Sequence, residues 1–316
     1  MSARTIPVIS EEAVIGAVSA QEAIDRTRAA FERHSRREWT MPAKVYLDSP
    51  PGDFRAMPAR GDGLALVKWV TSFPHNPERG RPVVTGVIAV SDAETGGELA
   101  IVDCRSVTWL RTGAAAAVSA QTLARPEAKS VGLIGCGVNG AWAARCLVAA
   151  GFGPGVCHDA RPTIAEDLAA ELGWRAGSRD EAVEADVIVT CTPGDRPVVF
   201  KSDLHEGQHL AALGADSRDK REIETEAVRH CRLFCDEWEQ ASAGGELSAS
   251  VAAGGVRRLD VTEIGDVLTD RAPGRRDQRE VTLFDSTGLA IQDLGIISAV
   301  MDAWRAGRLE APTVTL

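Results

Sequence analysis

One stretch in the middle of the chain limits the possible folds more than any other. Residues 130–151, SVGLIGCGVNGAWAARCLVAAG, read as a short apolar strand, a glycine-rich turn and a helix. The turn matches G-x-G-x-x-G in the strand-to-helix context that dinucleotide binding requires. Its glycines permit the turn, the approach of a pyrophosphate and close helix packing, and the helix N-terminus stabilises the phosphate charge. The predicted cofactor contacts in this turn are Gly135, Gly137, Val138, Asn139 and Gly140.

The acid that follows the turn favours one dinucleotide. Asp159 lies 19 residues after Gly140, at the end of the next predicted strand. A carboxylate there binds a ribose 2′-hydroxyl and repels a 2′-phosphate, which favours NAD. Arg161 is close by and suits a phosphate, so NADP stays open. The alternative is a glycine turn in some other α/β fold, but strand, helix and acid are all in place.

The two sides of this turn differ in pattern. From about residue 128, short apolar strands alternate with helical segments, which predicts a parallel sheet covered on both faces. From about 43 to 104, β-branched segments alternate with turns, and Asp92–Gly97 reads as a hairpin tip. The predicted class is α/β, with a Rossmann dinucleotide-binding domain and an α+β domain. We expect the last helix, about 287–306, to return to the first domain, so that the predicted domains are 1–122 with 290–316, and 123–289.

The composition argues against several classes of function. The chain has 316 residues, a formal net charge of −10 and 44% hydrophobic residues. An acidic chain is a poor match for nucleic acid or a membrane surface, and it has no apolar run long enough to span a bilayer. The N-terminus lacks the apolar core of a secretion signal. Seven scattered cysteines, with no His or Cys cluster near Cys231 and Cys235, indicate reduced core thiols in a cytoplasmic protein and no metal site.

Two cations on a predicted hairpin suit a carboxylate ligand. In KVYLDSPPGDFRAMP, residues 44–58, a four-residue turn places Tyr46 opposite Arg55 and brings Lys44 to the same face. An arginine grips both oxygens of a carboxylate, and a lysine adds a point charge. The alternative is a solvated face with ordinary surface cations, and the spacing alone does not separate the two readings.

A third cation, Lys68, is harder to explain as a surface residue. Its neighbours on its own strand face are Leu66 and Val70. A buried ammonium needs a partner or loses its proton, so such a lysine is paired to an anion or tuned for proton transfer. The alternative is an edge-strand lysine that reaches solvent.

Two aspartates have less distinctive contexts. Asp216 ends HLAALGAD, a predicted strand end where an α/β sheet binds ligands, and an acid there can hold an ammonium or activate water. The alternative interpretation of Asp216 is that it caps the N-terminus of a helix that follows it. Asp293 lies in the middle of a predicted helix, and we interpret it as a structural or interface carboxylate.

Seven motifs, in order from about residue 40 to 295, resemble the ornithine cyclodeaminase/μ-crystallin family: MPAKVYL, DFRAMPAR, VKWVTSFPHNP, LRTGAAAA, GCGVNG, GADSRDKREI and TLFDSTGLAIQDL. The first ones are most similar to the archaeal-type alanine dehydrogenase branch. The resemblance implies a homodimer, a substrate-binding and dimerisation domain (1–122 with 290–316), a Rossmann domain (123–289) and a bound nicotinamide cofactor.

The resemblance also assigns roles to positions of this chain. Lys44 and Arg55 match carboxylate-binding positions, Lys68 the proton donor or acceptor, and Asp216 the catalytic acid. Arg111 matches a residue that contacts cofactor or substrate. The remaining matches are cofactor contacts, Lys220 and Ser286.

The sequence indicates the family more specifically than it indicates the reaction. The expected activity is that of an NAD(P)-dependent oxidoreductase on CH–NH2 or C=N groups, which interconverts an amino acid with its imine or 2-oxo acid plus ammonia. One alternative is ornithine cyclodeaminase, which returns the hydride within the same cycle. Another is a binding protein that keeps the cofactor without catalysis. The residues that shape the substrate side-chain pocket are not identifiable from the sequence.

Overall fold

A computed structural model describes residues 4–217 and 220–316. The chain divides into two compact units. Unit 1 comprises Met1–Arg111, described from residue 4, and Leu289–Leu316, and unit 2 comprises Thr112–Gly288. The first boundary falls inside one long helix, α3 (Cys104–Leu123), whereas the sequence analysis placed it near the end of that helix. The C-terminal part of unit 1 starts at Leu289, whereas the sequence analysis placed that boundary at 290.

Unit 1 is built on a seven-stranded sheet with the order β15-β1-β6-β5-β4-β3-β2. Strands β2 to β6 form an antiparallel meander, and β1 adds parallel to β6. The strands are β1 (Thr5–Ile9), β2 (Val45–Ser49), β3 (Gly52–Gly61), β4 (Leu64–Ser72), β5 (Val84–Asp92), β6 (Glu98–Asp103) and β15 (Thr313–Thr315), with a short 3-10 helix at Asn76–Arg79. The predicted hairpin between β5 and β6 is confirmed.

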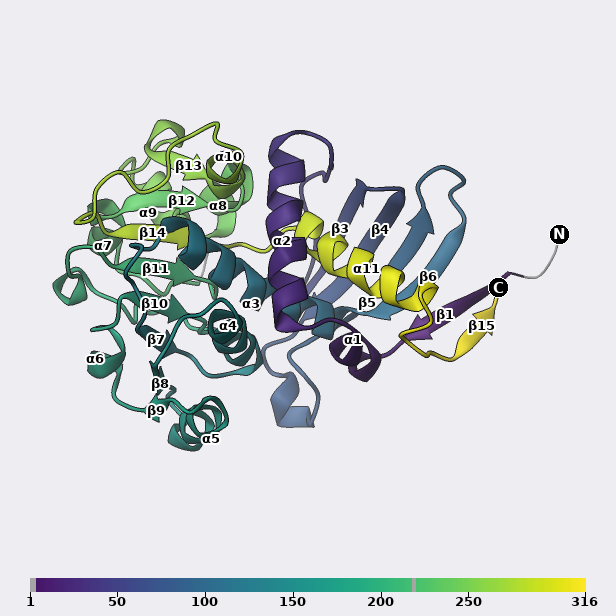
Figure 1. Ribbon diagram of the computed structural model, residues 1–316, viewed down its shortest axis with the longest axis horizontal. Helices are drawn as coiled ribbons and strands as arrows, with labels where there is room; N and C mark the ends of the chain where they lie inside the picture. Colours follow the sequence, from purple (N-terminus) through teal and green to yellow (C-terminus); the bar gives the residue numbers. More distant parts are fainter. Residues whose placement is uncertain (1–3, 218–219) are drawn as a thin grey trace. The chain divides into compact units, whose positions relative to one another are not determined.

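Helices cover the inner face of this sheet. Helix α11 (Ala290–Arg305) lies against β3 and β4 and packs beside α2 (Ala20–Ser35), as Figure 1 shows in yellow and purple. The side chains of Ser10 and Ser19 cap α1 (Glu11–Ala17) and α2. Nearly every residue in the first three turns of α11 is buried, so this helix belongs to the core of unit 1.

The outer face of the same sheet is apolar and uncovered within the unit. Cross-strand pairing aligns Val45, Ala56, Trp69 and Val87 across β2 to β5. The exposed fractions are 62% for Val45, 58% for Leu47, 41% for Trp69 and 47% for Val87. We call this set, together with Val67, the apolar outer face. Apolar patches of this kind mark interaction surfaces.

Unit 2 is a parallel eight-stranded sheet with the order β13-β12-β14-β11-β10-β7-β8-β9. Its strands are β7 (Val131–Ile134), β8 (Gly155–His158), β9 (Arg175–Ala176), β10 (Val187–Thr190), β11 (His209–Ala212), β12 (Arg232–Cys235), β13 (Val261–Glu263) and β14 (Thr282–Asp285). The helices after α3 are α4 (Val138–Ala149), α5 (Pro162–Leu172), α6 (Arg179–Ala182), α7 (Thr225–His230), α8 (Trp238–Gly244), α9 (Ser248–Ala252) and α10 (Ile264–Leu268), with 3-10 turns at Lys201–Asp203 and Arg258–Asp260. The order of β9, β8, β7, β10 and β11 is the 3-2-1-4-5 order of a Rossmann domain, which confirms the α/β prediction, and β14 takes the next place in the sheet.

Both faces of this sheet are buried, which explains its near-continuous apolar strands. One face packs Ile188, Leu210 and Leu283 against residues from α6 to α9. On the other face, buried His209 contacts Ser119 of α3 at 3.1 Å and Thr282 at 2.9 Å. Burial lowers the pKa of His209 to about 3, so the imidazole is a neutral core group.

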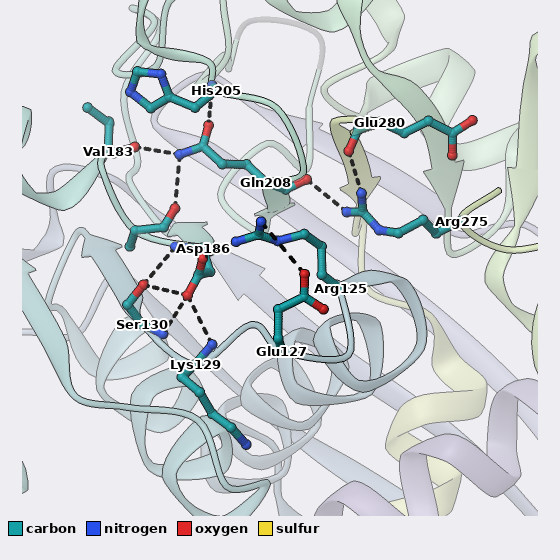
Figure 2. Close-up of polar contacts among 11 residues, drawn as sticks. Arg125, Glu127, Lys129, Ser130, Val183, Asp186, His205, Gln208, Arg275 and Glu280 are labelled. Atoms are coloured by element: carbon teal, nitrogen blue, oxygen red, sulfur yellow. Dashed lines mark hydrogen bonds and ion pairs between the residues drawn. The ribbon is translucent and has the colours of Figure 1, made fainter. Parts of the chain in front are cut away.

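Polar side chains close the end of the sheet where the strands begin (Figure 2). Asp186 accepts hydrogen bonds from the backbone N–H groups of Lys129 and Ser130 and from the Ser130 hydroxyl, and it pairs with Arg125. The Gln208 amide donates to two carbonyls and accepts from the His205 N–H. These contacts join the segments that enter β7, β10 and β11. We call this the amino end of the sheet.

No helix among residues 4–217 and 220–316 is long and apolar enough to cross a membrane. All seven cysteines lie within these ranges and carry free thiols.

Candidate active site

The glycine turn of unit 2 has the geometry that a dinucleotide needs. Gly135 has a φ of 97°, which favours glycine. A Cβ on Gly140 would lie 1.9 Å from the Gly135 carbonyl oxygen, so only glycine lets helix α4 come this close. A Cβ on Gly137 would meet nothing within 4 Å, which leaves open space at the N-terminus of α4. The turn therefore fits a pyrophosphate on backbone N–H groups.

Asp159 is locked to this turn. One carboxylate oxygen accepts a hydrogen bond from the Cys136 N–H at 2.9 Å, and the other accepts from the backbone and side chain of Arg161. Partial burial acts to raise the pKa of Asp159, but these hydrogen bonds outweigh it and hold the pKa below its usual range. The carboxylate is thus anionic beside the turn, whereas the Arg161 side chain is 68% exposed.

Other predicted cofactor residues lie where the parallel strands end, which we call the carboxyl end of the sheet. Ser286 follows β14 directly, and its buried hydroxyl has no hydrogen-bond partner among the described residues. The same is true of the Asn139 side-chain oxygen. Val138 is 52% exposed at the start of α4. Buried polar atoms without partners are rare in folded proteins, and their grouping here suits a bound ligand.

Asp216 and Lys220 are brought together in the loop after β11. The Lys220 ammonium lies 2.6 Å from an Asp216 carboxylate oxygen, and both side chains are partly exposed. Among the residues that the structure describes, the next helix after Asp216 is α7, which starts at Thr225. Asp216 is therefore not the N-cap of a helix that the structure describes.

A group of buried carboxylates supports this loop, and the sequence analysis missed it. Glu222 is fully buried, and each of its oxygens accepts two hydrogen bonds. One oxygen takes the Thr192 N–H and hydroxyl, and the other takes the Thr190 hydroxyl and the Gly214 N–H. Glu222 thereby joins the segments that leave β10 and β11. Its charged neighbours in the sequence, DKREIETE, look like a solvated surface and give no sign of this burial.

The other acids of this group are Glu246, Asp236 and Asp285. Glu246 accepts hydrogen bonds from the N–H groups of Glu222 and Ile223, and burial together with the charge of Glu222 raises its pKa to about 8. Burial, with Asp236 and Glu246 nearby, raises the pKa of Asp285 well above its usual value. Burial also raises the pKa of Glu222. Like charges in a dry site favour the protonated form, so the group retains protons that exposed acids would lose.

In unit 1 the predicted carboxylate site has the expected register. Tyr46 pairs with Arg55 across β2 and β3, and the guanidinium lies 5.4 Å from the centre of the Tyr46 ring. Arg55 makes two hydrogen bonds, 2.5 and 3.1 Å long, to the carboxylate of Asp53. A two-pronged contact to a carboxylate is therefore sterically possible at Arg55. Lys44 lies just before β2 and is half-buried.

Lys68 is the most buried of the predicted site residues in unit 1. It lies in the middle of β4, between β3 and β5, and is 1% exposed. Its ammonium donates to the Asp293 carboxylate at 2.9 Å and to the Thr108 hydroxyl at 2.6 Å. The alternative of an edge-strand lysine that reaches solvent is wrong. Burial lowers the pKa of Lys68, and the charge of Asp293 acts in the opposite direction.

Arg111 of α3 also lies against Asp293. We call Lys68, Thr108, Arg111 and Asp293 the Lys68 cluster. The Nε atom of Arg111 lies 3.6 Å from the Asp293 carboxylate and has no hydrogen-bond partner among the described residues. Within unit 1 the fold thus brings Lys68 and Arg111 to one carboxylate. Asp293, which we interpreted as structural or interfacial, is the group that both cations share. The chain shows no cluster of three or more His, Cys, Asp or Glu side chains that could hold a metal ion, within the described residues.

Comparisons with known proteins agree with these features. The family model described as ornithine cyclodeaminase/mu-crystallin matches residues 7–308. Alanine dehydrogenase of Archaeoglobus fulgidus is 37% identical over 302 residues, 93% of this chain and 94% of the relative. Iminosuccinate reductase of Paracoccus denitrificans is 31% identical over 309 residues, 93% of this chain and 95% of the relative. A structure of an archaeal alanine dehydrogenase dimer with bound NAD matches with a TM-score of 0.95 at 35% identity and covers 98% of this chain and 99% of its own. The chain belongs to the ornithine cyclodeaminase/mu-crystallin family.

Proposed function

We propose that this protein is an NAD(P)-dependent oxidoreductase that interconverts an L-amino acid with its imine, or with the 2-oxo acid and ammonia. Lys68 carries the proposal, because an ammonium 1% exposed in the middle of a sheet is costly unless the charge is used. The family and the relatives, an alanine dehydrogenase and an iminosuccinate reductase, support the same class of reaction.

The proposed roles follow from the side chains. Arg55 and Lys44 bind the α-carboxylate of the substrate, which takes the place that Asp53 has on Arg55. Lys68 and Asp216 move protons at the nitrogen-bearing carbon, and Arg111 contacts substrate or cofactor. NAD(P), which the glycine turn, Asp159 and Ser286 would hold, would supply the hydride acceptor or donor for that carbon. Loss of a hydride and a proton converts the amine to an imine, and water then releases ammonia from the imine carbon to leave the 2-oxo acid.

NAD is the proposed cofactor, with NADP as the alternative. The fit rests on the glycine turn, on the anionic Asp159 beside it and on the unpartnered Ser286 and Asn139 oxygens. Arg161 keeps NADP open, because a small movement of its exposed side chain would free it for a phosphate. Lys220 is the remaining proposed contact.

We also propose a homodimer and a cytoplasmic location. The apolar outer face of unit 1 supports self-association, since side chains such as Trp69 and Leu47 are 41% and 58% exposed within one chain. The dimeric alanine dehydrogenase structure is in line with this. The free thiols of the described cysteines suit a reducing compartment. On the same proposal, unit 1 is the substrate-binding and dimerisation domain and unit 2 the cofactor domain.

The first experiment measures NADH absorbance with a panel of 2-oxo acids, with ammonia or methylamine, and with cyclic imines. Consumption of NADH supports the proposal and names the substrate class. Ornithine is incubated in parallel with catalytic NAD, and proline without net NADH change would make the enzyme a cyclodeaminase instead. NADH binding with no turnover in either assay would favour a binding protein.

Substitution of Lys68 by alanine tests its role in this reaction. Turnover should fall by about a thousandfold or more, as for the loss of a proton-transfer group, while NADH binding stays nearly unchanged. Lys129→Ala is the matched control, because the Lys129 side chain is exposed and only its backbone N–H takes part in the contacts described. Equal loss of NADH binding and turnover in Lys68→Ala would contradict a role in proton transfer.

A further inference from the structure

We propose that Asp293 is a positioning residue for Lys68: it holds the ammonium in the buried site and keeps it protonated for the reaction. The inference rests on the proposed function only in taking Lys68 as the proton carrier. The contacts that support it all lie within unit 1.

The surroundings of Lys68 show why it needs such a partner. Its cross-strand neighbours are Met57 on β3 and Ile88 on β5, which are 4% and 0% exposed. Ile88 has no hydrogen-bond acceptor, and the Met57 thioether is only a weak one. Two groups from other elements supply acceptors, the Thr108 hydroxyl on α3 and the Asp293 carboxylate on α11. Asp293 is 0% exposed, so the ion pair is shielded from water and salt.

The hydrogen-bond directions leave one position on the lysine nitrogen free for chemistry. The Thr108 hydroxyl donates its proton to the Cys104 carbonyl oxygen at 2.6 Å, so toward Lys68 it can only accept. The carboxylate of Asp293 also accepts. An ammonium has three N–H groups, and a neutral amine has two N–H groups and a lone pair. Lys68 can therefore lose and regain its third proton without breaking either contact.

The groups around Lys68 shift its pKa in opposite directions, and the charge of Asp293 raises it. Burial lowers the pKa of Lys68, and the positive charge of Arg111 lowers it further. The negative charge of Asp293 acts against both. Cys104 also faces Lys68, but burial raises the pKa of its thiol to about 11, so the thiol is neutral near neutral pH. Asp293 itself lies in the first turn of α11, where the helix dipole favours a negative charge.

Within the part of the chain that the structure describes, the hydrogen bonds of Asp293 leave one of its oxygens unsatisfied. Its second oxygen is buried and has no hydrogen-bond partner among the described residues. By contrast, both oxygens of the fully buried Glu222 accept hydrogen bonds. Asp293 places its charge between Lys68 and Arg111 at the cost of one unsatisfied oxygen, which is the compromise expected where electrostatics serves a reaction.

The test reads Lys68 directly, because the chain has only five lysines: Lys44, Lys68, Lys129, Lys201 and Lys220. The full-length protein is labelled with 13C at the lysine ε-carbons, Lys68 is assigned with Lys68→Arg, and its resonance is followed by NMR against pH. In Asp293→Asn, which keeps the shape and removes the charge, the Lys68 midpoint should fall by about one pH unit or more. Asp293→Glu should restore most of the shift. An unchanged midpoint in a folded Asp293→Asn protein overturns the proposal.

Two controls keep the result interpretable. Asp302→Asn removes a carboxylate on the same helix that pairs with Arg26 and lies outside the Lys68 cluster, so it should leave the Lys68 midpoint unchanged. If Asp293→Asn does not fold, Arg111→Met replaces it. Loss of the opposing cation should then raise the Lys68 midpoint, and an unchanged midpoint there overturns the electrostatic argument.

The NMR result separates this inference from the proposed function. A lowered midpoint in a protein that turns over none of the test substrates supports the inference and contradicts the function. Turnover that depends on Lys68, with the same midpoint and the same pH–rate profile in Asp293→Asn, supports the function and overturns the inference.

Discussion

Asp186 and Glu222 each join neighbouring segments of one parallel sheet, Asp186 at its amino end and Glu222 at its carboxyl end. Asp186 joins the segments that enter β7 and β10, and Glu222 joins the segments that leave β10 and β11. The two carboxylates differ in the charged groups that surround them. Asp186 has Arg125 as a counter-charge, whereas the charged group against Glu222 is another acid, Glu246.

The pKa values move in opposite directions as a result. Partial burial acts to raise the pKa of Asp186, but the donors Lys129, Ser130 and Arg125 outweigh it and lower the pKa. Burial raises the pKa of Glu222 despite its four donors. The amino end is thus closed with matched charges. The carboxyl end has excess acid and unpartnered polar atoms, which is where α/β sheets bind ligands. The comparison indicates that the amino end is built for stability and the carboxyl end for function.

Glu222→Gln should have the largest effect on stability. Each Glu222 oxygen accepts from a backbone N–H, one from Thr192 and one from Gly214, and an amide nitrogen can replace neither acceptor. One buried N–H is therefore left without a partner, and we expect a loss of about 2–3 kcal/mol in the free energy of unfolding. Denaturant unfolding at pH 7 measures it. If Glu222→Gln lost less free energy of unfolding than Asp186→Asn, the expectation that Glu222 contributes more to stability than Asp186 would be contradicted.

Glu246→Gln should change the pH dependence of stability. The folded-state pKa of Glu246, about 8, lies above its ordinary value of 4.5, so the folded state binds more protons between these pH values. The stability from this group is complete below pH 4.5 and is lost as pH rises through about 8. The amide cannot ionise and keeps the acceptor for Glu222 and Ile223. Relative to wild type, the variant should gain about 1 kcal/mol or more between pH 6 and pH 8. Parallel curves of unfolding free energy against pH for the two proteins would contradict the raised pKa.

Asp186→Asn should have the smallest effect, with the opposite pH dependence. One Asp186 oxygen accepts all three neutral donors, so an amide oxygen in that place keeps them and only the pairing with Arg125 is lost. We expect a loss of about 1 kcal/mol at pH 7. Because the Asp186 pKa is lowered, its stabilisation is complete above its ordinary pKa of 3.8 and disappears as pH falls through the folded value. Acid unfolding curves of wild type and variant should therefore converge at the lowest pH. A difference that grows toward low pH would refute the assignment.

The sequence predicts those parts of the site whose constraints are local. Gly135 needs a positive φ and Gly140 a missing Cβ, and both requirements appear directly as glycines at fixed spacing. Lys68 stands out because strand alternation places a cation among apolar side chains. Asp53 is two residues from Arg55 on the same strand face, so their pairing could have been predicted from the register.

The missed residues depend on tertiary packing. Asp293 is 225 residues away from Lys68, and its helix is buried on nearly all sides, so no amphipathic pattern marks the carboxylate. Glu222 is surrounded in the sequence by charged residues, and its burial depends on Thr190, Thr192 and Gly214 from other segments. Such partners become visible only when the sheet is assembled.

The apolar outer face of unit 1 has a consequence for how the protein behaves in dilute solution. Strand β2 is an edge strand, and it carries Val45 and Leu47 at 62% and 58% exposure. On the homodimer proposal these side chains are covered only in the pair, so the melting temperature should rise with protein concentration. A chain made in small amounts would then spend more time alone, with an apolar edge strand open to aggregation and to chaperones. The concentration of the protein in the cell would then contribute to the stability of its folded state.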